Sequence, residues 1–467
     1  MDRPTVVVSG GIVVEETLWL PATATPRRKT HSMHEAEPPD EVVPPSEAPH
    51  DPYAALRNRD FRLYLSGNVV AILGMQMQSA AAQWEIYERT QSARHLGWIG
   101  LVQFLPVVCL TLVTGYVADR FDRRRVLVGC SLLSALASCG LVFVSYFRAD
   151  VWLMYACLFV TGVARSFQQP TKASFLPQMI PGEQFTNAVT WNTGGFHLST
   201  VVGPAVTGLL IWLTENAALV YLLDAVAHIV WLLTLSLIPS RPFTPSSSGV
   251  TVKTVVAGMR FVWRTKVILA AITLDMFAVL LGGATALLPI YAKDILHVGP
   301  QGFGWLRAAP AVGALAMAFV LAYYPPQRRA GWLLLWSVAG FGVATIVFGW
   351  SKSFPLSLAM LFLTGALDNI SVVIRHTLVQ LQTPNEMRGR VSAVNTLFIG
   401  ASNELGGYES GEVAAWFKRS GDPMFGPMVS VISGGIGTLL VVVGVAAVWP
   451  QLRQYQADHH RQPKRAG

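Results

Sequence analysis

Charged side chains are scarce in this chain: Asp, Glu, Lys and Arg together make up 13% of its 467 residues. Soluble domains usually carry about 25% charged residues. Apolar residues make up 52% of the chain. Most of them are gathered in runs of about 20 residues, each long enough to cross the hydrocarbon core of a membrane as a helix. The composition excludes a set of soluble domains and predicts a polytopic helical membrane protein.

Cysteine and the motifs of enzymes are equally sparse. The four cysteines, Cys109, Cys130, Cys139 and Cys157, all fall inside apolar runs, where we interpret them as small buried hydrophobic residues. No Cys and His residues have the spacing of metal ligands, so we expect no disulfide, metal or cofactor. The sequence has no nucleophile–base arrangement and no Walker-type phosphate loop, so we expect neither an enzyme nor direct use of ATP.

Twelve apolar runs predict an all-α protein with twelve transmembrane helices. Residues 1–56 precede them, and the stretch "EAEPPDEVVPPSEAPHDP" predicts a disordered cytoplasmic extension there. We place the runs at about 64–86, 96–118, 126–147, 151–169, 188–213, 217–238, 267–291, 303–324, 331–350, 355–378, 391–416 and 425–449.

Lys and Arg residues in the connections predict the orientation. One side of the membrane holds twenty-one of them and the other side seven. Cytoplasmic loops are the ones enriched in Lys and Arg, so we expect both termini in the cytoplasm, including the tail 450–467. The same topology accounts for the net charge of +8, so no nucleic-acid partner is expected.

The longest internal connection divides the body into two predicted six-helix bundles, 57–238 and 267–449. Between them, 239–266 is predicted to be a cytoplasmic linker with an amphipathic helix, because its apolar residues recur at helical spacing with basic residues on another face. A faint repeat relates "PGEQFTNAVTWN" (181–192) to "PNEMRGRVSAVNTL" (384–397). Such a repeat favours an internally duplicated transporter.

The stretch "GYVADRFDRRRVL" (115–127) places six charges between two apolar runs. Its arginines cannot enter lipid and anchor the turn on the cytoplasmic side, while Gly115 allows two helices to approach closely. Anchoring does not explain Asp119, because acidic residues contribute little to the positive-inside rule. The stretch therefore needs a second role.

This stretch, with the pattern G-x3-D-R-x-x-R-R between the second and third runs, resembles the signature loop of the major facilitator superfamily. The resemblance implies two six-helix bundles around a central cavity that opens alternately to each side. It also implies that the loop latches the cytoplasmic side of the outward-open state. The sequence departs from the family at Asp122, where Gly is usual. The matching residues are Gly115, Asp119, Arg120, Arg123 and Arg124.

The fifth run contains "GPAVTG", with Gly203, Pro204 and Gly208. Proline kinks a helix and small residues allow close packing. The stretch resembles the exporter motif of proton-coupled family members, with Thr207 in place of one Gly. Stretches such as "NRDFRLYLSGN" and "RGRVSAVNTLFIGASNELGG" further resemble the subfamily of the enterobactin exporter and macrolide efflux proteins. This resemblance implies export of a siderophore-like or drug-like compound.

Ionisable residues inside the runs cost about 2.5–3.5 kcal/mol each at mid-membrane, so each needs a partner, a cavity or a function. An acid that faces the cavity can bind a proton from one side and release it on the other. Alternatively, the acids are permanently paired with Arg165, Arg307 or Arg375. The candidates for proton coupling are Asp275 first, and then Asp224, Asp368 and Glu404.

In the family fold, the first, fourth, seventh and tenth helices line the cavity. Acids and amides there would suit an amphipathic or cationic cargo, whereas arginines would suit an anionic one, and both remain open. In addition to Asp275 and Asp368, the cavity candidates are Asn68, Gln76, Gln83, Arg165 and Arg375.

Together these features predict a monomeric exporter in the plasma membrane that moves a small organic molecule out by proton antiport. Its expected partners are the cargo, the proton and membrane lipid. The alternatives are a proton-independent facilitator or importer, and a non-transporting membrane receptor on the same fold.

Overall fold

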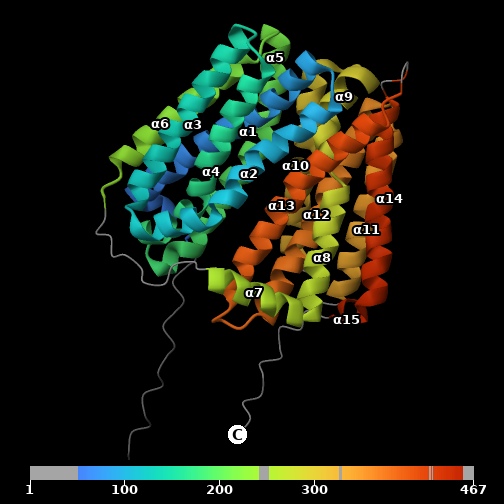
Figure 1. Ribbon diagram of the computed structural model, residues 1–467. Helices are drawn as coiled ribbons and strands as arrows, with labels where there is room; N and C mark the ends of the chain where they lie inside the picture. Colours follow the sequence, from blue (N-terminus) through green and yellow to red (C-terminus); the bar gives the residue numbers. More distant parts are fainter. Residues whose placement is uncertain (1–50, 241–251, 325–328, 420–421, 423, 456–467) are drawn as a thin grey trace, which may run out of the picture. The chain divides into compact units, whose positions relative to one another are not determined.

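The computed structural model (Figure 1) describes residues 51–240, 252–324, 329–419, 422 and 424–455. This part of the chain is helical apart from one isolated bridge between Arg419 and Asp422. The helices of the first half are α1 (Arg59–Thr90), α2 (Ala93–Arg120), α3 (Arg123–Tyr146), α4 (Val151–Met179), α5 (Phe185–Thr214) and α6 (Ala218–Leu237).

The second half begins with a short helix and contains an interrupted segment after α8. Its helices are α7 (Val252–Arg264), α8 (Lys266–Leu281), α9 (Leu288–Ile290), α10 (Gly299–Tyr323), α11 (Ala330–Trp350), α12 (Phe354–Gln382), α13 (Arg388–Trp416), α14 (Phe425–Val448) and α15 (Pro450–Arg453). The shorter elements are the 3-10 turns η1 (Ala55–Arg57), η2 (Gly182–Gln184) and η3 (Ala284–Leu287), and the π-helical turn η4 (Tyr291–Ile295).

Ten helical segments of the described chain are long and apolar enough to cross a membrane. Helices α1 and α13 have 32 and 29 residues, so they are also long enough, but they are more polar than the others. Helix α13, for example, carries Glu404, Glu409 and Glu412. The structure confirms an all-helical, multi-pass membrane protein, and the crossing of the membrane by α1 and α13 stays a prediction.

The seventh run, 267–291, is not the continuous helix that its apolar composition predicts. Helix α8 ends at Leu281, and two glycines, Gly282 and Gly283, precede the turn η3. Glycine weakens a helix interior by about 1 kcal/mol relative to alanine. A Cβ on Gly282 would lie 2.7 Å from the ring of Phe341, so the close approach of α11 also favours glycine at this break.

Helix packing groups the helices of each half together. In the first half α1 packs on α5 and α6, and α3 packs on α4 and α6. In the second half α10 and α11 pack on α12, and α13 and α14 pack on α8. Figure 1 shows α3 beside α6 and α11 beside α14, with α7 at one end of α8 and α13. Helix α7 lies within the linker 239–266, where the sequence predicts an amphipathic helix.

Most of the predicted disordered extension, residues 1–50, lies outside the described residues. Residues 51–56 belong to the folded body instead, because they are held against α5. The carbonyl oxygen of Pro52 accepts hydrogen bonds from Asn187 Nδ2 at 2.6 Å and from Trp191 Nε1 at 3.0 Å. The ring of Tyr53 lies 6.0 Å from that of Trp191. The extension therefore ends earlier than predicted.

The cysteines are less uniformly buried than predicted. All four are free thiols, of which Cys130 is buried while Cys109 and Cys139 are exposed. The exposed pair lie on α2 and α3, on the surface of helices that the composition places in lipid. A thiol is apolar enough for that environment, so an apolar run alone does not separate core from lipid-facing positions.

Three clusters of buried apolar side chains stabilise the body. The largest draws on both halves, since it joins residues such as Trp84 and Leu158 to Phe303 and Leu361. The other two each belong to one half: one surrounds Val262 and Leu378, and the other surrounds Phe61 and Trp231. The described halves therefore share a core at one end and keep separate cores at the other.

Candidate transport site

Two pairs of helices bring the halves together at the end opposite α7. A Cβ on Gly208 of α5 would lie 2.5 Å from the carbonyl oxygen of Pro300 and 2.9 Å from the Cα of Gly304, both on α10. A Cβ on Gly411 of α13 would lie 2.8 Å from the Cα of Gly97 on α2. Only glycine permits backbones to approach this closely. The exporter-like motif thus contributes Gly208 to a contact between halves.

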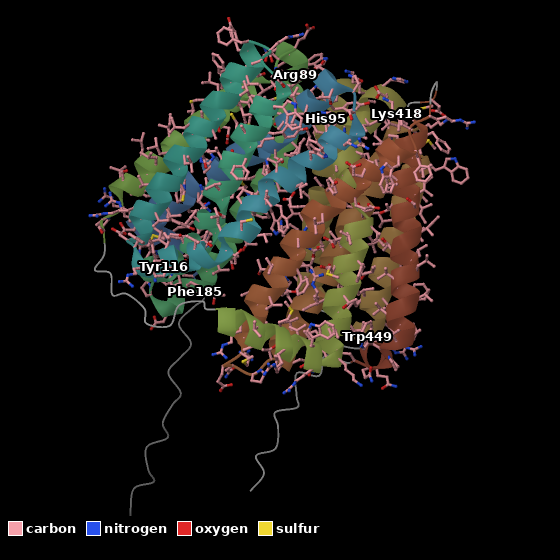
Figure 2. The ribbon with its side chains drawn as sticks, in the orientation of Figure 1. Arg89, His95, Tyr116, Phe185, Lys418 and Trp449 are labelled. Carbon is pink, nitrogen blue, oxygen red and sulfur yellow. The ribbon has the colours of Figure 1, made fainter. Side chains whose placement is uncertain are left out.

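Side chains tie the same end together. Tyr87 of α1 donates a hydrogen bond to Asp294 in η4, and Arg94 of α2 forms an ion pair with Glu412 of α13 at 3.0 Å. Figure 2 places the labelled Arg89, His95 and Lys418 at this end, and Tyr116, Phe185 and Trp449 at the other. With a shared core here and separate cores at the α7 end, the halves are closed at the end opposite α7.

A cluster of polar and charged side chains lies directly inside this closure. We call Arg165 (α4), Arg307 (α10) and Glu404 (α13) the central cluster. The carboxylate of Glu404 is within electrostatic reach of both guanidinium groups, although Arg165 comes from the other half. All three side chains are partly buried. Their partners come from both halves, so the cluster lies at the interface between the halves.

Neutral groups hold the two arginines of the central cluster in place. Arg307 donates hydrogen bonds to Gln83 and, at 3.0 Å, to Ser79 Oγ, both on α1. Arg165 donates to Gln103 Oε1 of α2 at 3.3 Å. These partners position the guanidinium groups without neutralising their charge. Of the predicted cavity residues, Gln83 and Arg165 are therefore brought to the interface between the halves.

Two other predicted cavity residues, Asn68 and Gln76, bind side chains of α5 within the first half. Asn68 is buried and donates to Asn192 Oδ1 at 2.9 Å, and Gln76 donates to Thr200 Oγ1 at 2.9 Å. Both acceptors belong to α5. A Cβ on Gly203 of the exporter-like motif would lie 2.7 Å from the Cβ of Gln76. These residues hold α1 against α5 within the first half.

The first proton-coupling candidate is paired. Asp275 of α8 forms an ion pair with Arg375 of α12, and both side chains are more than 90% buried. Asp368, two turns before Arg375 on α12, lines a small cavity of about 10 Å³ together with Asp275 and Ser371. It also lines a larger cavity of about 180 Å³ beside the break after α8. The paired carboxylate of Asp275 and the second carboxylate, Asp368, therefore border the same small cavity.

Asp224 is enclosed within the first half. Its side chain is fully buried on α6 and accepts a hydrogen bond from Ser138 Oγ of α3 at 2.6 Å. The Nε2 atom of His228 lies 3.6 Å from its other oxygen, and Gln78 of α1 donates to Ser138 at 3.1 Å. This network joins α1, α3 and α6, away from the interface between the halves, which favours a packing role.

The charged loop lies at the α7 end. Asp122 caps α3 by accepting from the backbone N–H of Arg124 at 3.0 Å, and it accepts from Ser240 Oγ at 2.8 Å. Arg124 donates to the carbonyl oxygens of Leu235 and Ser236 at 2.9 and 2.6 Å. These carbonyls end α6, so Arg124 binds within its own half rather than to an acid of the other half.

The other residues of the loop motif lie at the adjoining ends of α2 and α3. Arg120 lies over the ring of Tyr116 at 5.6 Å, and Arg123 is the first residue of α3. Gly115 lies in the last turns of α2. The side chain of Asp119 lies outside what the structure describes, so its predicted latch contact stays a prediction. An unlatched loop is what we expect where the halves are closed at the opposite end.

The contact of Arg124 with α6 predicts a measurable stability effect. Removing the guanidinium in Arg124→Ala leaves two helix-end carbonyls without their charged donor, and hydrogen bonds to charged groups contribute about 1.5–3 kcal/mol. We expect a lower thermal unfolding midpoint in detergent. Arg125→Ala is the matched control, because the side chain of Arg125 is 88% exposed. Its Nε atom lies 3.7 Å from Asp122 Oδ2, which is too far for a hydrogen bond. Equal midpoints for the two variants would contradict this role.

Sequence reasoning missed part of this arrangement. Arg307 was expected only as a possible partner of an acid, not as a cavity residue, and Ser79 and Gln103 were not singled out. Arg307 and Gln83 are 224 positions apart, so no periodicity links them. The sequence signal that was present is an arginine inside an apolar run, which is costly enough to need a function or a partner.

The comparison with known families follows this geometry. The family model described as Major Facilitator Superfamily matches residues 64–407. The chain belongs to the major facilitator superfamily. It is therefore a membrane transporter by family, as the resemblance of its loop implies. The match spans most of both halves, so it includes the loop, the motif in α5 and the central cluster.

Relatives and solved structures agree with this assignment. The Enterobactin exporter EntS of Shigella boydii serotype 18 and that of Escherichia coli O1:K1 are each 24% identical over 402 residues, which cover 85% of this chain and 93% of theirs. A bacterial homologue of the human lysosomal transporter Spinster, solved inward-facing and unoccupied, has a TM-score of 0.67 at 14% identity, over 85% of this chain and 97% of its own. A bacterial homologue of the iron transporter ferroportin, inward-facing, has a TM-score of 0.64 at 15% identity, over 85% and 99%.

Proposed function

We propose that this superfamily member exports a small organic molecule across the plasma membrane in exchange for protons. Its similarity to proteins named as exporters supports the direction. The charge asymmetry of the loops supports a cytoplasmic α7 end, so the closed end faces outward and the structure is inward-facing. In this state the cytoplasmic end is the one that is not closed, and an exporter takes its cargo from that side.

One observation carries the proton coupling: two carboxylates, Asp275 and Asp368, line the same small cavity, and Asp275 forms an ion pair with Arg375. Arg375 can neutralise only one of them at a time. The other must take up a proton or stand as an uncompensated charge, which is costly inside a membrane. Asp368 lines both cavities, so it can accept a proton from the larger one and pass it toward Asp275.

The small cavity offers a path for that transfer. Its volume of about 10 Å³ is close to the minimum that holds one water, and a buried water needs two to four polar partners. Asp275, Asp368 and Ser371 supply them, and Ser371 Oγ is a buried hydroxyl without a hydrogen-bond partner. A proton reaching Asp275 releases Arg375, which gives α8 and α12 two arrangements that differ by one proton.

Glu404 and Asp224 are less suitable as the proton-binding site of an antiporter. A proton on Glu404 would free Arg165 and Arg307 to bind an anion, so proton and anion would bind together and move in the same direction. Asp224 lies within the packed first half. Antiport requires that proton and cargo bind to different states, which favours a proton site separate from the interface between the halves.

The test begins with an untargeted comparison of compounds in the medium and inside cells. The strains carry the protein, lack it, or carry Asp275→Asn. We expect one compound to leave only in the first strain. In everted membrane vesicles the same compound should then dissipate an imposed pH gradient, and Asp275→Asn and Asp368→Asn should each lower this proton movement by at least tenfold.

Asp150→Asn is the matched control, because Asp150 lies outside the spans and caps α4 by accepting from the backbone of Trp152 at 3.0 Å, which asparagine also does. Continued export by both cavity variants without proton movement would replace antiport by the facilitator alternative. Accumulation of the compound inside cells that carry the protein would indicate import. If no compound moves, and the protein still restores the phenotype of the strain that lacks it after its cavity has been blocked, the receptor alternative is favoured.

A further inference from the structure

The central cluster carries an excess of positive charge. It contains two guanidinium groups, of Arg165 and Arg307, and one carboxylate, of Glu404. Two positive charges facing one negative charge leave one positive charge between the halves without a fixed partner.

Three other arginines of the described helices each form an ion pair with a carboxylate. Arg375 pairs with Asp275, Arg89 pairs with Glu85, and Arg94 pairs with Glu412. The central cluster departs from this pattern, although a charge within the membrane is costly. The hydrogen bonds that these arginines donate to Ser79, Gln83 and Gln103 fix the direction of the guanidinium groups but do not neutralise their charge. Such an arrangement is suited to a ligand that brings its own negative charge.

We propose that the cargo carries an anionic group, such as a carboxylate or phenolate, which replaces Glu404 between Arg165 and Arg307. This inference rests on the proposed transport function and names the chemical class of its cargo. Arginine binds planar anions through two parallel hydrogen bonds. Because Arg165 belongs to the first half and Arg307 to the second, the anion contacts both halves at once.

Glu404 then acts as an internal competitor. Without cargo its carboxylate is the negative charge within electrostatic reach of both arginines. An anionic cargo must displace it, so removing its charge should strengthen binding, whereas removing either arginine should weaken binding. A residue that served only in packing would not produce these opposite effects.

The experiment measures binding rather than transport. The full-length protein is purified in lipid nanodiscs, and equilibrium dialysis measures the binding of 2-naphthoate and of 2-naphthamide, which share a shape but differ in charge. We expect naphthoate to bind at least tenfold more tightly than naphthamide. Glu404→Gln should tighten naphthoate binding at least threefold, and Arg307→Gln should weaken it at least tenfold. Naphthamide binding should change in neither variant.

Arg148→Gln is the control for loss of a positive charge, since Arg148 is exposed in the turn before α4. If Arg307→Gln does not fold, Arg165→Gln tests the same role from the other half. The inference would be overturned if the two probes bound equally well. It would also be overturned if Glu404→Gln bound naphthoate no more tightly than the unchanged protein does, or not at all. Dialysis involves no proton gradient, so it tests anion selectivity independently of proton antiport. Either proposal can therefore be contradicted while the other stands.

Discussion

Replacing Gly208 by valine should trap the transporter with its outer end open and lower transport at least tenfold. A Cβ at this position meets the carbonyl oxygen of Pro300 at 2.5 Å and the Cα of Gly304 at 2.9 Å. Both are backbone atoms of α10, so neither can move aside as a side chain would. The two helices must separate, and the inward-facing state loses the contact that closes it.

The measurement is the distance between spin labels at Thr214, at the end of α5, and His297, just before α10, after replacement of the four native cysteines. Both sites are exposed. The distance should lengthen in Gly208→Val, because a cost of several kcal/mol on one state moves the population to the other. Gly194→Val is the control on the same helix, since nothing lies within 4 Å of a Cβ there.

An unchanged distance together with normal transport in Gly208→Val would show that α5 and α10 do not form the outer closure. Loss of transport without a change in distance would also contradict it, because the defect would then lie elsewhere than in the gate.

Removing one member of the Asp275–Arg375 pair should be far more damaging than removing both. In Asp275→Ala the guanidinium of Arg375, which is only 2% exposed, remains as an uncompensated buried charge. Breaking a buried pair in this way costs about 3–5 kcal/mol. We expect low yields and a much lower thermal midpoint in detergent, because this cost is a large part of the stability of a folded protein.

The double variant Asp275→Leu with Arg375→Met should recover most of the lost stability, because well-packed apolar residues often replace a buried pair without cost. It should nevertheless fail to couple export to protons. Asp51→Ala is the control, since its partner Arg57 is 80% exposed and exposed pairs contribute at most about 1 kcal/mol. Proton coupling that survives in a stable double variant would assign the pair a purely structural role.

The helices of this protein could be predicted from the sequence because lipid allows few alternatives. Apolar runs mark most of the ten clear spans to within a few residues, and the spacing of apolar residues in the linker marks α7. Helix α4 is an exception, because it extends to Met179, ten residues beyond the predicted run 151–169. The exception at Gly282 and Gly283 shows the limit. Apolar composition continues across the break, and only the consecutive glycines signal it.

The site could be predicted only in part, for a different reason. The cost of a charge in the membrane singles out Asp275, Glu404, Arg165 and Arg375 in the sequence. Which acid meets which arginine depends on helices that meet across the two halves. Arg375 was one of three possible partners of the acids, and only the packing of α8 on α12 selects Asp275 for it.

The shared core at the outer end has a mechanical consequence. Helix α2 contacts α13 near Gly97 and Gly100, while its last 16 residues, from Leu105 to Arg120, extend about 24 Å toward the cytoplasm at 1.5 Å per residue. The contact can then serve as a fulcrum and the remainder of α2 as a lever. A rotation of roughly 10° about the contact displaces the far end by about 4 Å over that length. Small changes in side-chain packing at the fulcrum are thereby amplified into a change in access at the opposite face, where the charged loop lies.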